Sequence, residues 1–350
     1  MKKFAVLISF LAFMCIASAA QAVSMEVQGF KLGINGYVDL QYNYMSKAPM
    51  SDGSIMSESS AFRQEQFNLL FDAEKERYRA HINLQAEDTF TSEDGGKGVW
   101  KLQEAYGEYR FNDLLDARAG FILTPFGIYN EVSYITSLYA SVVLPFIYEL
   151  PEGYSGNRIV PDNSNVVVSG NYLGDNVEVN YNLFISNGRR EASGEDMNKD
   201  KGLGTRVRLT FLDDYKIGAS YYTVQNDKTT EGREQLLGID IEMNLRNLLL
   251  QGEIVKDIFS KKFDRLTYYA RLTYEMGKLS PFVMYDYFED PNDLVWKNKQ
   301  SRYGVGASYD ISRNVILKGE YHYHNFANDA GLPQDTDTVQ MLRAAVIFIF

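Results

Sequence analysis

Residues 66–86 read QFNLLFDAEKERYRAHINLQA, and this stretch contains the pattern that decides the fold. From Tyr78 to Gln85 polar and apolar residues alternate without interruption, and residues 66–73 alternate with a single exception at Leu70. A period of two is expected for a β-strand that has one apolar and one polar face. Residues 74–77 are a connection short enough for a turn, so the stretch predicts a β-hairpin.

The same alternation recurs along the chain and predicts sixteen antiparallel strands. They are expected near residues 33–44, 62–74, 78–87, 101–111, 115–122, 165–173, 177–186, 204–212, 215–225, 235–244, 248–256, 265–275, 279–288, 301–309, 315–326 and 339–350.

The connections between these strands alternate between short and long. The short ones are residues 74–77, 112–114, 173–176, 212–214, 245–247, 275–278 and 310–314, and the long ones include 45–61, 88–99, 187–202 and 327–338. Transmembrane barrels have short periplasmic turns and long external loops, whereas a soluble β-sandwich has no reason to sort its loops by length. The predicted fold class is therefore all-β, a transmembrane antiparallel β-barrel of about 16 strands.

The two faces of such a barrel meet different solvents. The apolar face must meet lipid, and the 25 Tyr and 21 Phe residues are the composition expected of aromatic girdles. A barrel of about 16 strands is too wide for side chains to fill, and the chain has no residues left over for a plug. We therefore expect a water-filled channel for passive diffusion of small hydrophilic solutes or ions, surrounded by outer-membrane lipid in a Gram-negative bacterium.

The first residues have the features of a secretory signal. Lys2 and Lys3 precede an apolar run over residues 4–16, which is shorter than the ~20 residues of a spanning helix, and residues 20–22 (AQA) form a small-x-small cleavage site. We expect a cleaved signal peptide over residues 1–22 and a single barrel domain over 23–350. Cleavage would remove the only cysteine, Cys15, so disulfides are not expected. The net charge of −11 disfavours nucleic acid as a partner.

One external connection, residues 123–164, is much longer than the others. It contains an apolar and aromatic run over residues 134–150, followed by Pro151 and Gly153. A loop in water should not carry so much apolar surface. We expect this third loop to fold inward against the wall and narrow the lumen; packing over a neighbouring subunit or the rim is the alternative.

Charged side chains in the lumen and on this loop are the candidates for ion selectivity, because a ring of one sign attracts the opposite ion. The candidate lining and constriction residues are Arg79, Glu104, Glu108, Arg110, Arg118, Glu131, Glu149, Glu152, Arg158, Asp162, Arg206 and Arg208. One hypothesis is an acidic third loop facing a basic wall of Arg79, Arg110 and Arg118. The alternative is that the lumen charges pair across strands and keep the wall hydrated.

Several short segments resemble the phosphate-selective porin family. The segment RAGFILTPFG (residues 118–127) is similar to the fifth strand of that family, NLFISNGR (182–189) to a strand ending in Asn-Gly, and GASYY (218–222) and PFVMYDYF (281–288) to later strands. The resemblance implies a sixteen-stranded, homotrimeric porin with its third loop in the pore. Phe350 matches the terminal aromatic residue of bacterial outer-membrane barrels, which implies an assembly signal for the barrel assembly machinery. The long loops carry no basic cluster and no coiled-coil segment precedes the first strand, so phosphate selectivity is not carried over.

Two other function classes are alternatives to a channel. A barrel hydrolase is disfavoured because no Gly-x-Ser-x-Gly motif is present. His322 and His324 share one strand face, which allows two-residue metal coordination, but such histidines are more often polar wall residues. A barrel sleeve around a periplasmic partner, such as a multihaem cytochrome, is the remaining alternative. We expect no enzyme activity, catalytic residue, metal or cofactor.

Overall fold

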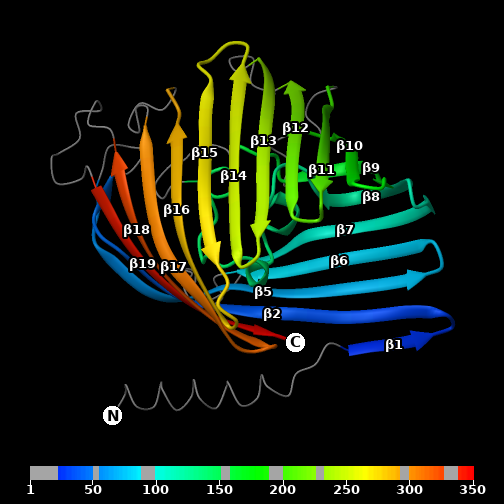
Figure 1. Cartoon of the computed structure of the whole chain (residues 1–350), viewed down its shortest axis with the longest axis horizontal. Helices are drawn as coiled ribbons and strands as arrows, with labels where there is room; N and C mark the ends of the chain where they lie inside the picture. The colour runs from blue at the N-terminus through cyan, green and yellow to red at the C-terminus, as the bar shows by residue number, and fades with distance from the viewer. Residues whose placement is uncertain are drawn as a thin grey trace.

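The computed structural model describes residues 23–49, 55–87, 99–150, 158–188, 200–225, 232–291, 299–326 and 338–350. Within them, sixteen antiparallel strands form a closed barrel (Figure 1). The strands are β2 (Phe30–Met45), β5 (Ser59–Lys75), β6 (Tyr78–Glu87), β7 (Val99–Asn112), β8 (Leu115–Leu123), β9 (Asn163–Leu173), β10 (Val177–Ser186), β11 (Gly202–Phe211), β12 (Tyr215–Gln225), β13 (Arg233–Leu245), β14 (Leu248–Phe259), β15 (Arg265–Tyr274), β16 (Leu279–Glu289), β17 (Gln300–Ser312), β18 (Val315–Phe326) and β19 (Thr338–Ile349).

Each strand pairs with its neighbours in the chain, and β19 pairs with β2 to close the ring. The predicted fold class is confirmed, and β6, β10, β12 and β18 have the predicted bounds. The predicted signal peptide, residues 1–22, lies outside the described residues. Among the described residues, no helix is long and apolar enough to cross a membrane.

Three short strands were not predicted. β1 (Val23–Val27) folds back onto the first residues of β2, through a turn in which Gln28 and Gly29 both have positive φ angles of 52° and 79°. Positive φ at both central residues is typical of tight hairpins. β3 (Ala48–Pro49) and β4 (Ile55–Met56) pair inside the first external connection, where a loop was expected. Segments of two to five residues are too short for alternation to reveal them.

The strands present their apolar residues to the outside. On β13, Leu237 and Ile239 are exposed, whereas Leu236 and Asp240, which point into the barrel, are buried. Aromatic rings pair across neighbouring strands near both ends of the barrel. Tyr268 stacks on Tyr287 with centroids 4.8 Å apart on the external half, and Tyr78 meets Tyr109 at 4.9 Å beside the periplasmic turns. These pairs are typical of the aromatic girdles of a membrane barrel.

The main apolar core is the contact between the third loop and the inner wall. Loop residues such as Phe126, Phe146 and Ile147 are buried against inward side chains that include Leu236 and Phe288. The loop contains two 3-10 segments, η1 (Asn130–Val132) and η2 (Thr136–Leu138), and lies within the ring of strands (Figure 1). The barrel therefore has a filled side, where the loop meets β10–β18, and an opposite wall formed by β2 and β5–β8.

Candidate functional site: the third loop and the lumen

The first part of the third loop is fixed to β12 and β14. The Gly127 N–H donates to Ser220 Oγ at 3.2 Å, and Glu253 accepts from the Ile128 N–H at 3.3 Å and from the Tyr148 hydroxyl at 2.6 Å. Gly127 has a φ of 64°, and a Cβ at this position would lie 2.0 Å from a Glu253 carboxylate oxygen. Glycine is thus required where the Pro-Phe-Gly segment approaches the wall.

The middle of the loop is fixed by two charged residues of β18. Lys318 Nζ donates to the carbonyl oxygens of Thr136, Tyr139 and Ser141, the last at 2.9 Å. The Glu320 carboxylate accepts from the N–H groups of Val142 and Val143 at 2.7 and 2.8 Å. Both wall residues are buried. A buried charge must find such partners, because leaving it unpaired costs several kcal/mol.

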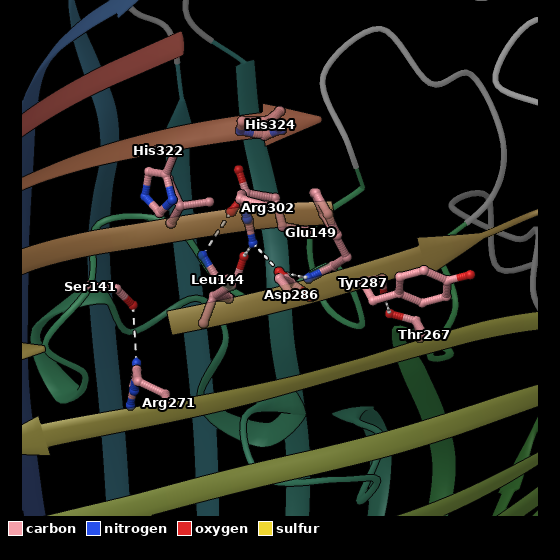
Figure 2. Close-up of polar contacts among 12 residues, drawn as sticks. Ser141, Leu144, Glu149, Thr267, Arg271, Asp286, Tyr287, Arg302, His322 and His324 are labelled. Atoms are coloured by element: carbon pink, nitrogen blue, oxygen red, sulfur yellow. Dashed lines mark hydrogen bonds and ion pairs between the residues drawn. The ribbon is translucent and has the colours of Figure 1, made fainter. Parts of the chain in front are cut away.

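The third anchor of the loop is an ion pair between β16 and β17. Arg302 pairs with Asp286 and donates to the Leu144 carbonyl oxygen at 2.7 Å, while Asp286 accepts from the Phe146 N–H at 2.9 Å. Figure 2 shows both side chains pointing from adjacent strands toward the loop. The pair therefore uses its remaining hydrogen-bonding capacity on the loop main chain.

A fourth contact joins the loop to β15. Arg271 donates to Ser141 Oγ at 3.1 Å and to the Tyr129 hydroxyl (the Ser141 contact is drawn in Figure 2). Burial raises the pKa of Tyr129 to about 12, although the nearby Arg271 guanidinium opposes this shift. The phenol is thus neutral at physiological pH and acts as a hydrogen-bonding group. The inward charges of β14–β18 hold the loop, rather than only hydrating the wall.

Cavities lie on both sides of the loop, one facing β2, β5 and β19 and another facing β13–β18. One of about 310 Å³ lies between the loop and β2, β5 and β19. It is lined by Gln41, Glu65, Gln66, Tyr134, Glu149 and Arg343, among others. A second cavity, of about 410 Å³, lies toward the periplasmic turns, and Tyr139 borders both. A third, of about 300 Å³, lies at the periplasmic mouth.

Five of the predicted residues form ion pairs on the third loop or between the loop and the barrel wall. Arg118 Nη2 lies 3.5 Å from Glu131 Oε1, and Arg158 pairs with Asp162 and donates to the Tyr134 hydroxyl at 3.1 Å. Glu149 lies 3.6 Å from Arg343. An acidic loop group thus meets a wall arginine at Arg118 and at Arg343.

The other predicted residues are elsewhere. Glu104, beside His81 at 3.7 Å, accepts from the Leu123 N–H where the loop begins. Arg206 pairs with Asp240 at 3.0 Å and is buried under the loop. The remaining positions are Arg79, Glu108 and Arg110 at the periplasmic mouth, Arg208 on the half-buried inner face of β11 near Glu242, and Glu152, which lies outside the described residues.

Alternation missed one lining residue, Glu65. The register between β2 and β5 shifts between Asp39 and Leu40, so Glu65 has no partner on β2 and lies in a β-bulge. A bulge reorients the side chains on one side of it, which places Glu65 at the 310 Å³ cavity.

The two histidines of β18 each contact a neighbouring polar side chain. Their ring centroids are 6.3 Å apart; His322 Nε2 lies 2.9 Å from Glu320, and His324 Nδ1 lies 2.9 Å from Gln300 Nε2. In the described part of the chain, no group of three or more His, Cys, Asp or Glu residues could hold a metal ion.

A closed barrel with a polar lumen and a loop folded into it defines an outer-membrane channel. A family model described as Gram-negative porin matches residues 5–329, so the chain belongs to the Gram-negative porin family. It is a porin channel of the outer membrane.

Solved structures of three channels share the fold at low sequence identity. The outer membrane channel DcaP of Acinetobacter baumannii has a TM-score of 0.64 at 11% identity, with 94% of this chain and 100% of that chain covered. OmpF of Salmonella typhi gives 0.66 at 11%, with the same coverage. An anion-selective porin from Comamonas acidovorans gives 0.65 at 12%, covering 92% and 100%. A search of curated proteins finds no match.

Proposed function

We propose that solutes and ions cross between the third loop and the wall formed by β19, β2 and β5. The observation that carries the proposal is the 310 Å³ cavity, which has loop residues on one side and the polar side chains of Gln41, Glu65 and Gln66 on the other. The loop is anchored on the opposite wall, at β12–β18, so we place the passage past the loop on this side. The pathway suits passive diffusion of small hydrophilic solutes or ions.

The constriction of this pathway lies at the level of the third loop. We assign to it the ion-paired residues Arg118, Glu131, Glu149, Arg158 and Asp162, of which Glu149 and Arg158 line the cavity. Arg206 is buried under the loop and so does not contact passing solutes. Arg79, Glu108 and Arg110 belong to the periplasmic mouth.

Only some of the properties implied by the resemblance to phosphate-selective porins are included in the proposal. It supports assembly as a homotrimer in outer-membrane lipid, with Phe350 as the signal for the barrel assembly machinery. Phosphate selectivity is not proposed, because the loop carries more acidic than basic residues at the constriction. The family match favours neither a sleeve for a periplasmic protein nor a hydrolase.

Single-channel recording of the refolded mature chain in a planar bilayer tests the pathway. We expect stable ohmic steps in groups of three. Gln66→Trp, which places a large ring in the cavity, should lower conductance. Leu69→Trp, on the outward face of the same strand, is the matched control and should not change it. A folded barrel that conducts no current, or equal conductance of the two variants, would overturn the proposed pathway.

A further inference from the structure

The ion pairs at the constriction have unequal partners. The Arg118 side chain is 16% exposed and its partner Glu131 is 40% exposed. The Arg343 side chain is 8% exposed and its partner Glu149 is 38% exposed. In both pairs the carboxylate side chain is therefore more exposed to solvent than the arginine side chain.

The third pair repeats this asymmetry. Arg158 is 22% exposed, and Asp162 is 42% exposed. The Arg158 guanidinium is covered by Tyr134, whose ring centroid lies 5.8 Å from it. In all three pairs at the level of the loop, the acidic side chain is therefore the more exposed member.

At the periplasmic mouth the order is reversed. Arg79 is 42% exposed and its partner Asp72 is 25% exposed, and Arg110 is 61% exposed beside Glu108 at 12%. The exposed group here is the guanidinium in each pair.

Exposure decides which member of a pair an ion in the lumen senses. Coulomb energy falls with distance, and salt screens charges beyond about 8–10 Å, so the group nearest the water dominates. A neutral ion pair with one buried partner thus presents the sign of its exposed partner to the lumen.

We propose that the channel selects cations at a constriction lined by Glu131, Glu149 and Asp162, and that the opposite sign at Arg79 and Arg110 makes its current asymmetric. This inference rests on the proposed pathway between loop and wall. When the external side is at positive voltage, cations move inward through the acidic constriction. Anions move outward through the basic periplasmic mouth, so the two kinds of ion move toward each other. Ions accumulate between the two levels, so conductance is higher at this polarity than at the reverse.

Reversal potentials across a KCl gradient at low salt test the selectivity. We expect the wild type to pass K⁺ over Cl⁻ by at least about threefold, since an acidic lining concentrates cations. The triple variant Glu131→Gln, Glu149→Gln, Asp162→Asn should bring the ratio close to one. The Leu144 N–H donates to the Glu149 carboxylate at 2.9 Å, and the amide oxygen introduced by Glu149→Gln can accept the same bond. The loop therefore retains this contact in the variant.

A matched control removes the same charge outside the lumen. Asp113, Asp175 and Asp213 are exposed residues of three periplasmic turns. Their triple replacement by Asn should leave the ratio unchanged. A wild-type ratio at or below one, or an equal effect of the two triple variants, would overturn the cation selectivity.

Arg79→Gln with Arg110→Gln tests the asymmetry separately. The double variant should pass equal currents at both polarities while remaining cation-selective, in bilayers where the orientation has been established by one-sided proteolysis of the external loops. Symmetric current in the wild type would contradict this part. Absence of any current from a folded barrel would instead contradict the channel pathway itself, so the two failures are distinguishable.

Discussion

Lys318 Nζ donates a hydrogen bond to the Ser141 carbonyl oxygen at 2.9 Å, although 177 residues separate the two in the chain. The same ammonium meets the carbonyl oxygens of Thr136 and Tyr139 and lies 4.7 Å from the Tyr139 ring centroid. One wall cation therefore organises the loop main chain from Thr136 to Ser141, and the loop carbonyl oxygens accept the hydrogen bonds of the buried ammonium.

Replacing Lys318 by Met should loosen the third loop. The change leaves three carbonyl oxygens without their donor, at a cost of about 1–3 kcal/mol for each that stays buried. We expect larger current fluctuations and a higher mean conductance in single-channel recordings. Lys216→Met is the control, because Lys216 is also on the inner wall but pairs with Glu242 at 2.6 Å. Recordings of Lys318→Met that match the wild type would contradict the anchor.

Removing one member of the buried Arg302–Asp286 pair should destabilise the barrel. Arg302→Met leaves the Asp286 charge without its guanidinium, and such losses cost about 3–5 kcal/mol. The double variant with Asp286→Leu should recover part of the lost unfolding free energy, because no unpaired charge remains. The recovery should be incomplete, because the Phe146 N–H loses its acceptor. Urea unfolding in detergent measures the differences. The control Arg110→Met breaks an exposed ion pair and should lower the free energy of unfolding by less than about 1 kcal/mol. An equal loss in Arg302→Met and Arg110→Met would refute the expectation.

The attachment of the loop should weaken at high pH. Burial raises the pKa of Tyr129 to about 12, whereas a phenol on a detached loop titrates near ~10. The anchored state therefore binds the proton more tightly. Its stability is complete below about pH 10 and declines as the pH rises toward 12.

Current noise recorded at pH 8 and pH 11 checks this effect. Tyr129→Phe should reduce the pH dependence without abolishing it, because burial also raises the pKa values of Tyr139 and Tyr148. Tyr172→Phe, at an exposed position on β9, should behave as the wild type does. Identical pH profiles in all three proteins would show that ionisation of Tyr129 does not weaken the attachment of the loop.

The outward face should tolerate charge only near the ends of the strands. Ile239 lies at the middle of β13 and is exposed on the lipid side. Arginine there should cost about 2–4 kcal/mol in a phosphatidylcholine bilayer, whereas Leu245→Arg, at the end of the same strand, should cost about 0–1 kcal/mol. Equal costs in equilibrium unfolding would indicate that β13 does not cross the bilayer at the expected depth.

Phe350 has a structural contact that must be separated from its role as a signal. Its main chain exchanges two 2.9 Å hydrogen bonds with Gly36, and its ring stacks on Phe67. We expect Phe350→Ala to refold in detergent nearly as well as the wild type but to reach the outer membrane of cells in smaller amounts. A parallel loss in both assays would assign Phe350 to barrel stability alone.

Alternation predicted the strands well because lipid outside and water inside impose a strict period of two. β6 and β10 have the predicted bounds for this reason. The prediction failed where the period is interrupted. The bulge in β5 turned Glu65 to the lumen, and β1 was too short for its alternation to be recognised.

The candidate site was predicted less completely than the barrel. The period of the strands indicated that Lys318 and Arg302 point inward, but not that they hold the third loop. That depends on the path of residues 124–150, which have no strand period and are placed by contacts with residues far away in the chain. Similarly, Arg206 and Arg118 both point inward. The position of the third loop determines that Arg206 is covered and that Arg118 remains beside the lumen.

The contacts that anchor the third loop to β12–β18 join residues from 93 positions apart, at Gly127 and Ser220, to 182 apart, at Thr136 and Lys318. Every anchor thus belongs to the later part of the chain, while the loop belongs to the earlier part. Such long separations make these contacts among the slowest to form. During folding the third loop therefore cannot take its final position until β12–β18 are in place, so the narrow passage is completed late.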